Sequence, residues 1–293
     1  MNDGFEYHKP TTIKEAIKLL GKYGETAKVI ASGVSLVILL REKLIQPEHL
    51  VSLSGLKELD FIRIDGNGEL RIGALATHRS IEKNPEIIKN FGVLAEMEAE
   101  LGSVQVRNRG TIGGNLCHAE PLSDPPPVIA ALRGTVVLQG SKGERRLPVE
   151  DFIKDYYETD LKPGEILTEV RMPKLPPNTG CSYLKLTGRK GMDLPFVGVA
   201  VLLTLDKTKK ICEDVRIVLG AVATRPVHAR ASEELLSGKN IAEISGGLAA
   251  EAGKLAMAGA EPIPDVRCSA QYKRKMVGVM VKRAINEAIK RAS

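Results

Sequence analysis

Two glycine-containing segments carry groups that could hold an anionic ligand. The first, KVIASGVSL, runs from an apolar stretch at Lys28–Ala31 through the small residues Ser32–Ser35 into a second apolar stretch that begins at Leu36. A strand that enters such a turn before a helix exposes backbone N–H groups, and the helix dipole adds positive potential there. The segment matches neither the GxGxxG nor the P-loop pattern. Taken alone, it is better explained as a tight structural turn.

The second segment, VQVRNRGTIGGNLCHAEPLSD, spans residues 104–124 and shows little apolar periodicity, so it is hard to explain as protein core. Its adjacent glycines, Gly113 and Gly114, would let a ligand approach the backbone closely. Thr111 and Asn115 offer a hydroxyl and an amide on either side of them. This combination favours a binding loop.

Three charged residues of the second segment have two interpretations each. Asp124 could accept a hydrogen bond from a ligand hydroxyl, or it could cap a helix that begins with Pro125. Arg107 and Arg109 could hold an anion or a neighbouring acid. The residues alone do not separate these alternatives.

The elements that position these segments are predicted from periodicity. Thr12–Leu20 has apolar residues at helical spacing and a capping-box pattern of Thr12 with Glu15, and Gly21 is expected to end this helix. A second helix is predicted over Pro85–Leu101. Strands are predicted at Lys28–Ala31, Leu50–Leu53, Leu70–Ile72, Thr135–Leu138, Arg145–Val149 and Leu167–Val170.

Three prolines in MPKLPPNT, residues 172–179, indicate a linker between two domains. Beyond it we predict strands at Ser182–Leu186, Val197–Leu205 and Val215–Leu219, followed by helices at Arg230–Leu236, Ile241–Met257 and Ala270–Ala292. The fold class is therefore α+β. We expect domains at residues 1–175 and 179–293.

Composition excludes several classes of protein. The 293 residues are 43% hydrophobic and 27% charged, which is typical of a globular protein of about two domains. The longest apolar stretch, Phe196–Leu205, is about half of a membrane span, and no leader-like segment opens the chain. The four cysteines show no zinc or iron-sulfur spacing. We therefore expect a cytoplasmic protein with reduced thiols, no membrane span and no metal site of its own.

The net charge of +6 is concentrated at the C-terminus. From Gln271 onward, seven basic residues stand against the single acid Glu287, so this segment carries the whole excess. Met276, Met280 and Ile285 fall on one side of the expected helix, which leaves a basic outer face. A solvated helix face explains this best, and a patch for a protein partner or anionic cofactor comes second. Nucleic acid is disfavoured because aromatic residues make up 4% and tryptophan is absent.

Several segments together resemble the FAD-binding subunits of molybdenum hydroxylases, a family that includes the carbon monoxide dehydrogenase medium subunit and the xanthine dehydrogenase flavin domain. KVIASGVSL is similar to the first flavin-binding segment, and VQVRNRGTIGGNLCHAEPLSD to the second. LKPGEILTEVRMP, YLKLTGRK, FVGVAV and DVRCSAQYKR follow in the family's order. The resemblance thus covers essentially the whole chain.

The resemblance implies a vanillyl-alcohol-oxidase-type FAD-binding domain of two α+β subdomains, at about 1–54 and 55–175. A C-terminal α+β domain with a small antiparallel sheet and helices would follow it. Cofactor-binding residues carried over from the family are Lys28, Ala31, Ser32, Gly33, Val34, Ser35, Thr111, Gly114, Asn115, Asp124 and Leu167, with Ile166 as the alternative to Leu167 against the flavin ring.

Within that set, the Ala31–Ser35 turn would hold the diphosphate, and Asp124 would bond ribityl hydroxyls. Ser32 stands where relatives usually have glycine, and Val34 where they usually have a polar residue. A positive φ at Ser32 would cost roughly 1 kcal/mol. We therefore expect FAD to be held less tightly than in relatives.

The function implied is electron transfer through noncovalently bound FAD, with no catalytic residue on this chain. A 2Fe-2S subunit and a molybdenum-cofactor subunit are the implied partners, in a dimer of heterotrimers without nucleic acid. A free-standing FAD oxidoreductase and a flavin-free structural subunit are the alternatives. The first would need its own acid or base, and the five histidines show no pairing in the sequence.

Overall fold

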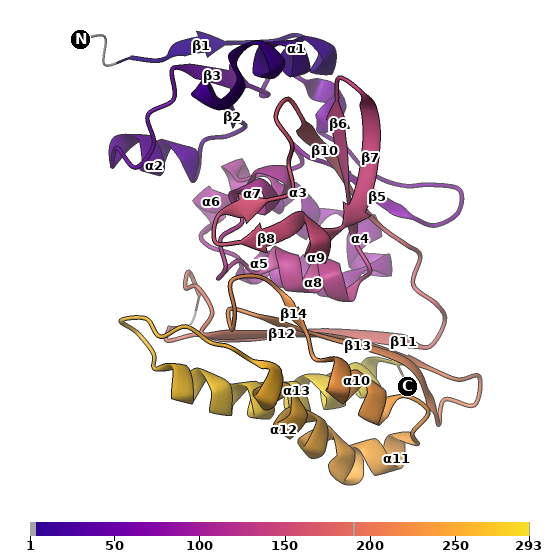
Figure 1. The fold of residues 1–293 in the computed structure, drawn as a ribbon. Helices are drawn as coiled ribbons and strands as arrows, with labels where there is room; N and C mark the ends of the chain where they lie inside the picture. Colours follow the sequence, from indigo (N-terminus) through magenta and orange to yellow (C-terminus); the bar gives the residue numbers. More distant parts are fainter. Residues whose placement is uncertain (1–3, 190, 293) are drawn as a thin grey trace.

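The computed structural model describes residues 4–189 and 191–292. Lys190, the last residue of YLKLTGRK, lies outside the described residues. Residues 1–3 and 293, at the ends of the two expected domains, lie outside them as well. Three units are stacked along the long axis of the molecule, each with its own sheet (Figure 1). The α+β class is confirmed. In the described part of the chain, no helix has both the length and the apolar character needed to cross a membrane.

The first unit is a parallel sheet of order β1-β3-β2 covered by a helix. Its elements are β1 (Glu6–His8), α1 (Ile13–Tyr23), the 3-10 turn η1 (Gly24–Thr26), β2 (Ala27–Ile30), α2 (Leu36–Arg41) and β3 (His49–Ser52). Thr12 caps α1, because its side chain accepts from the Glu15 N–H. The Glu15 carboxylate bonds Thr11 and not Thr12, so the capping box is only half formed.

Helix α1 continues beyond its predicted end at Gly21. A side chain at Gly21 would meet no atom within 4 Å, so this exposed glycine imposes no turn. The helix ends instead at Gly24, whose φ of +54° suits a residue without Cβ. The helix buries Ala16, Ile17 and Leu20 against the sheet.

The second unit is an antiparallel sheet of order β4-β5-β10-β6-β7 packed on helices. Its strands are β4 (Ile62–Ile64), β5 (Leu70–Gly73), β6 (Thr135–Gly140), β7 (Gly143–Pro148) and β10 (Ile166–Met172), with a hairpin of β8 (Ile153–Asp155) and β9 (Glu158–Thr159). Its helices are the 3-10 turn η2 (Lys57–Leu59), α3 (His78–Lys83), α4 (Pro85–Asn90), α5 (Gly92–Glu100), α6 (Val104–Arg109), α7 (Ile112–His118), α8 (Pro125–Ala131) and α9 (Val149–Phe152).

The prediction of one helix over Pro85–Leu101 was wrong, because α4 and α5 are separate. Phe91 lies between them with φ −139° and ψ 45°, outside the helical region, and its ring is 2% exposed. Turning the chain at Phe91 places this ring in the main core, and burying a phenylalanine contributes about 1.5–3 kcal/mol.

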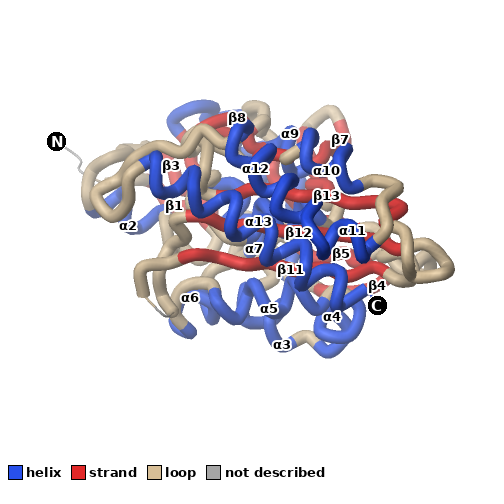
Figure 2. The backbone as a smooth tube through the Cα atoms, turned by 90° about the horizontal axis from the view of Figure 1, so that it is seen from below, coloured by secondary structure: helices blue, strands red, loops and turns tan. Residues whose placement is uncertain are grey.

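The third unit is a four-stranded antiparallel sheet of order β11-β12-β13-β14. Its elements are β11 (Thr179–Leu186), β12 (Val197–Leu205), β13 (Cys212–Gly220), β14 (Val227–His228), α10 (Arg230–Leu236), α11 (Ile241–Glu243), the π-helical turn η3 (Ile244–Leu248), α12 (Ala249–Gly259) and α13 (Ala270–Ala292). Figure 2, seen from below, shows α12 and α13 lying across the strands. The expected helix Ile241–Met257 is thus interrupted by η3, whereas α10 and α13 match their predicted bounds.

Helix α13 confirms the expected apolar stripe but corrects the charge on its outer face. Met280 and Ile285 are buried. Lys273 is also buried, at 2% exposed, and its Nζ donates to the Ile263 carbonyl (2.9 Å) and lies 3.0 Å from the Asp265 carboxylate. Lys273 therefore fastens the preceding loop and is not part of a solvated basic surface.

We propose that the domain divisions follow the three sheets. The strands of the first lie within residues 6–52, those of the second within 62–172 and those of the third within 179–228. These spans are compatible with subdomains at about 1–54 and 55–175 and a C-terminal domain at 179–293.

Candidate functional site

A cavity of about 810 Å³ lies between the first and second units. Its wall is formed by the loop after β2, by α7 and the residues before it, and by the start of β10, with contributions from α2 and the β8–β9 region. Small-molecule and cofactor sites in proteins typically occupy about 300–1,000 Å³. The cavity is therefore large enough for a sizeable ligand.

Ten of the eleven residues carried over from the family line this cavity, and Asp124 does not. The lining residues are Lys28, Ala31, Ser32, Gly33, Val34, Ser35, Thr111, Gly114, Asn115 and Leu167, and Ile166 lines it as well. They come from segments up to 139 positions apart in the sequence, which the fold brings together around one space.

The turn from Ala31 to Ser35 joins β2 to α2. Gly33 has φ +81°, which favours glycine, and a Cβ there would lie 2.9 Å from the Cγ2 atom of the exposed Val37 side chain. Ser32 does not adopt a positive φ. The backbone strain considered for Ser32 therefore does not arise, which corrects that expectation. The Ser35 side chain makes no capping hydrogen bond to α2.

Thr111 and the glycine pair shape the second wall. Thr111 caps α7 by accepting from the Gly114 N–H (3.2 Å). Gly113 packs against Ala74, because a Cβ at Gly113 would lie 2.6 Å from the Ala74 Cβ and 2.7 Å from its carbonyl oxygen. A Cβ at Gly114 would meet only the Thr111 hydroxyl, at 2.8 Å. Both glycines thus line the cavity, but Gly113 is also packed tightly against Ala74, while Gly114 has free space beside it.

Asn115 follows on the same helix, and its Oδ1 accepts a hydrogen bond from the Ser123 hydroxyl (2.8 Å). This bond fixes the orientation of the side-chain amide at the cavity. The second segment is therefore folded into the short helices α6 and α7 around Gly110, although it lacks the apolar periodicity by which helices are recognised.

Asp124 lies just beyond the cavity, at the junction with the third unit. Its carboxylate is 3% exposed, accepts from the Tyr183 hydroxyl (2.6 Å) and forms an ion pair with the Lys185 ammonium (3.1 Å). Asp124 occupies the predicted N-cap position of α8, which begins with Pro125, but its side chain makes no capping bond to the helix. Burial raises the pKa of Asp124, and this outweighs the lowering effect of Lys185 and Tyr183. A role of Asp124 toward ribityl hydroxyls stays a prediction.

Arg107 is held by protein groups. Its guanidinium bonds the Glu82 carboxylate (2.9 Å) and the carbonyls of Leu101 (2.9 Å) and Gly102 (3.2 Å). Of the two interpretations of this arginine, the structure supports the neighbouring acid.

The start of β10 supplies an aliphatic part of the wall. Ile166 and Leu167 are 2% and 3% exposed and line the cavity. Glu165, immediately before them, forms a two-point ion pair with Arg145 (2.8 and 2.7 Å). Hydrogen bonds from Arg145 lower the pKa of Glu165, so this carboxylate stays ionised and paired at neutral pH.

Sequence reasoning missed two polar groups of the wall. His78 contacts the buried Glu98 through Nδ1 (2.8 Å), and no hydrogen-bond partner for the second Glu98 oxygen occurs among the described residues. Tyr157, from the β8–β9 hairpin, donates to Glu120 (2.6 Å), and its ring lies 5.1 Å from that of His118. The one local sequence signal near His78 is Thr77, which caps α3 and so could have predicted where this helix begins.

The thiol and the phenol on this wall are protonated at neutral pH, whereas the imidazole is neutral. Burial raises the pKa of the Cys117 thiol to about 12, so it is protonated at neutral pH. The hydrogen bond to Glu120 raises the pKa of Tyr157 to about 12. Burial lowers the pKa of His118, which makes the neutral imidazole the dominant form. A protonated thiol is a poor nucleophile, whereas a neutral imidazole can accept a proton.

Comparison with known proteins identifies both halves of the chain. Residues 3–175 match the FAD-binding domain in molybdopterin dehydrogenase, and residues 182–288 match the CO dehydrogenase flavoprotein C-terminal domain. The sequence is 36% identical to the carbon monoxide dehydrogenase medium chain of Hydrogenophaga pseudoflava, covering 97% of this chain and 96% of that one. It is 33% identical to the 6-hydroxypseudooxynicotine dehydrogenase complex subunit alpha of Paenarthrobacter nicotinovorans, covering 98% and 95%.

Solved structures agree with the sequence comparison. The carbon monoxide dehydrogenase of H. pseudoflava that lacks the Mo-pyranopterin moiety matches with a TM-score of 0.94 at 36% identity, covering all of both chains. Quinoline 2-oxidoreductase from Pseudomonas putida 86 matches with a TM-score of 0.90 at 34% identity, covering 99% and 98%. The chain therefore belongs to the FAD-binding medium subunits of the molybdenum hydroxylase family of oxidoreductases.

Proposed function

We propose that this chain is the electron-transfer subunit of a molybdenum-containing hydroxylase or dehydrogenase complex. It would pass electrons between a partner 2Fe-2S subunit and an external acceptor, with the molybdenum cofactor on a second partner subunit. Relatives named as a medium chain and as a subunit of a dehydrogenase complex support such an assembly. The proposal includes a dimer of heterotrimers and a cytoplasmic location.

The observation that carries the proposal is the composition of the cavity wall. Small residues and backbone form the two turns, and aliphatic residues form the wall at β10. Glu165 is paired with Arg145, His78 with Glu98 and Tyr157 with Glu120. A general acid or base needs access to a substrate proton, and these three groups are already engaged by protein partners. The wall suits a large bound cofactor better than an organic substrate.

The residues present fit FAD. The Ala31–Ser35 turn and Ser35 would hold the diphosphate through backbone N–H groups and a hydroxyl. Thr111, Gly114 and Asn115 would line the diphosphate and ribityl chain, and the open side of Gly114 gives them room. Leu167, with Ile166, would pack against the ring system. FAD, when bound, supplies the redox chemistry.

The chain's own part is to orient this cofactor and to keep water from it. Buried Ile166 and Leu167 form a dry surface at β10, and Asn115 is held in place by Ser123. We also propose that the cofactor is noncovalent, because the protonated Cys117 thiol is a poor nucleophile.

Copurification tests the proposal. The full chain should be isolated from its native host under mild conditions, and the flavin spectrum, iron and molybdenum of the preparation should be measured. We expect oxidised-flavin absorption together with two further subunits that carry iron and molybdenum. A flavin-containing chain that turns over an organic substrate alone would favour a free-standing oxidoreductase. A complex with iron and molybdenum but without flavin would leave only a structural role.

A further inference from the structure

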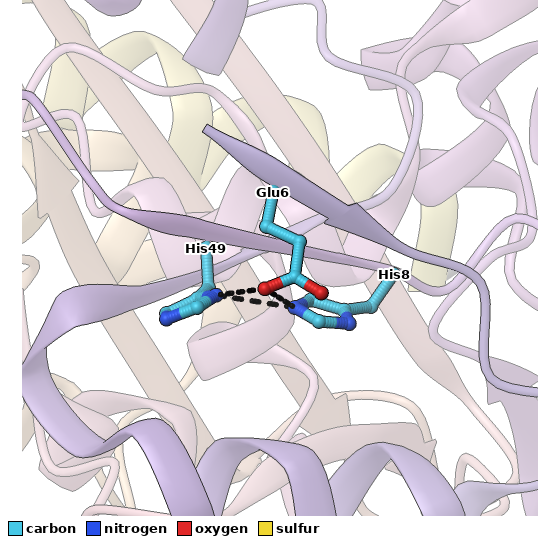
Figure 3. A group of neighbouring side chains, drawn as sticks. All are labelled: Glu6, His8 and His49. Atoms are coloured by element: carbon cyan, nitrogen blue, oxygen red, sulfur yellow. Dashed lines mark hydrogen bonds and ion pairs between the residues drawn. The ribbon is translucent and has the colours of Figure 1, made fainter. Parts of the chain in front are cut away.

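Three potential metal ligands converge on the outer end of the first sheet, away from the cavity. They are the carboxylate of Glu6, Nε2 of His8 and Nδ1 of His49, and all three atoms lie within 4.8 Å of one another (Figure 3). The two imidazole nitrogens are 3.2 Å apart. The Glu6 Oε2 atom is 3.3 Å from the His49 nitrogen and 3.8 Å from the His8 nitrogen.

Strand pairing explains why these residues meet, although 41 positions separate the two histidines. Glu6 and His8 are two residues apart on β1, so their side chains lie on the same face of the sheet. β1 runs parallel to β3, and Glu6 is directly opposite His49. Neighbouring strands lie about 4.8 Å apart, which brings the three side chains within reach of one ion.

The observed distances are within about 0.3 Å of those between ligands of a zinc ion. Zinc binds histidine nitrogen at about 2.0–2.1 Å and carboxylate oxygen at about 2.0–2.2 Å, usually with tetrahedral geometry. Two ligands of such an ion are about 3.3–3.5 Å apart. The three separations here, 3.2, 3.3 and 3.8 Å, bracket that range. We propose that Glu6, His8 and His49 bind a divalent transition-metal ion, with zinc as its natural occupant.

Burial and stacking hold the two imidazoles in place for this role. The side chains of His8 and His49 are 13% and 15% exposed, whereas that of Glu6 is 62% exposed. The Tyr23 ring stacks on His49 with centroids 3.6 Å apart and on His8 at 5.0 Å. The two imidazoles are thus held by burial and stacking, while the Glu6 carboxylate lies toward solvent. Water would supply the fourth ligand of the ion from the solvent side.

The positive charge of Lys22, near Tyr23, opposes binding of a cation. The Lys22 ammonium bonds the Tyr23 hydroxyl (2.9 Å) and lies over the Tyr23 ring. Its repulsion weakens binding, and the Glu6 carboxylate offsets that effect. Mixed imidazole and carboxylate ligands suit zinc, whereas Mg²⁺ prefers oxygen ligands alone. The site should therefore select zinc over Mg²⁺.

An ion here would connect β1 to β3. β1 has three residues and, among the described strands, pairs with β3 alone. β3 is the central strand and lies beside β2, from which the Ala31–Ser35 turn emerges. Metal binding would therefore stabilise the N-terminal strand and, through β3, the unit that forms one side of the cavity. None of the three ligands lines the cavity, so this inference is independent of the proposed function.

Metal titration tests the site. The untagged full chain is treated with a chelator, dialysed and titrated with Zn²⁺ by calorimetry, with Mg²⁺ as the control ion. We expect one zinc per chain, no binding of Mg²⁺ and a melting temperature that rises with zinc concentration. His49→Gln and His8→Gln should each weaken zinc binding at least tenfold, and Glu6→Gln should weaken it less because its carboxylate is the most exposed ligand.

Glu48→Gln is the matched control, since it removes the same charge from an exposed residue next to His49. It should leave both zinc affinity and the zinc-dependent rise in melting temperature unchanged. Because Glu6 is largely exposed, Glu6→Gln should fold even if a histidine variant does not. Its zinc affinity can then be compared with that of the native chain. A zinc Kd weaker than about 1 mM, or equal zinc binding by the native chain, Glu6→Gln and the foldable histidine variants, overturns the proposal.

Discussion

Gly113 and Gly114 are adjacent, but valine should have opposite consequences at the two positions. At Gly113 the new Cβ would lie 2.6 Å from the Ala74 Cβ and 2.7 Å from the Ala74 oxygen, about 1 Å inside ordinary contact distance. The hydrogen bond from the Gly113 N–H to the Ala74 oxygen (3.0 Å) would also be strained. Overpacking of this kind costs about 1–3 kcal/mol.

The Gly113→Val protein should therefore melt about 2–12 °C below the native protein, since 1 kcal/mol corresponds to about 2–4 °C for a domain of this size. At Gly114 a Cβ would meet only the Thr111 hydroxyl, which can rotate at the cost of one weak hydrogen bond of about 1 kcal/mol. The higher helix propensity of valine relative to glycine offsets part of that loss. The flavin-free Gly114→Val protein should therefore unfold within about 4 °C of the native one.

Flavin binding should show the reverse order. A valine at Gly114 projects along the cavity wall, so FAD must shift or force the wall outward. If this costs about 1–3 kcal/mol, affinity falls about 5–150-fold. Flavin-to-protein ratio after gel filtration, FAD titration and thermal melting of the flavin-free proteins measure both effects. A soluble Gly114→Val protein with its full flavin complement would refute our placement of the cofactor.

Three further predictions concern attachment, the C-terminal loop and pH. Acid precipitation should release the flavin into the supernatant, since Cys117 is a protonated thiol; colour retained in the washed pellet would show a covalent bond. Lys273→Gln should lower the free energy of unfolding by about 1–3 kcal/mol through loss of the buried bonds to Asp265 and Ile263, whereas exposed Lys275→Gln should not, as urea titration would show. Burial raises the pKa of Glu82, but hydrogen bonds from its basic neighbours outweigh this and lower it to about 2, against an ordinary 4.5. The stability that Glu82 contributes is thus complete above pH 4.5 and lost as the pH falls toward 2, so Glu82→Gln should flatten this part of the stability profile; an unchanged acid limb would contradict it.

Local signals were sufficient for much of the fold. Thr12 and the apolar spacing after it predict α1, and the sequence of α13 predicts its bounds and its buried stripe. The cavity-lining turns were predicted mainly because the sequence resembles a family, since the Ala31–Ser35 turn alone looks like any small-residue turn. The two helices were predictable because their signals lie among neighbouring residues, and the turns because each is part of a motif within one segment.

Features that depend on distant partners were not predictable. The break at Phe91 follows from the place of this side chain in the main core, which only the folded chain defines. Asp124 stands at the start of α8 as predicted, but its side chain bonds Tyr183, 59 positions away, and not the helix. His8 and His49 show no pairing along the chain, and only the register between β1 and β3 brings them to 3.2 Å.

The buried contact between Asp124 and β11 limits how this protein can be divided. Asp124 is neutralised by Lys185, and the largest core cluster includes Ala200, Leu202 and Val218 beyond the proline-rich linker. A chain cut at residue 175 would expose the apolar residues of α8 to water and remove Lys185 and Tyr183 from Asp124. We therefore expect that neither half folds stably without the other. A chimera that takes one half from a relative should therefore also take that relative's residues at positions 124, 183 and 185, which contact each other across the junction.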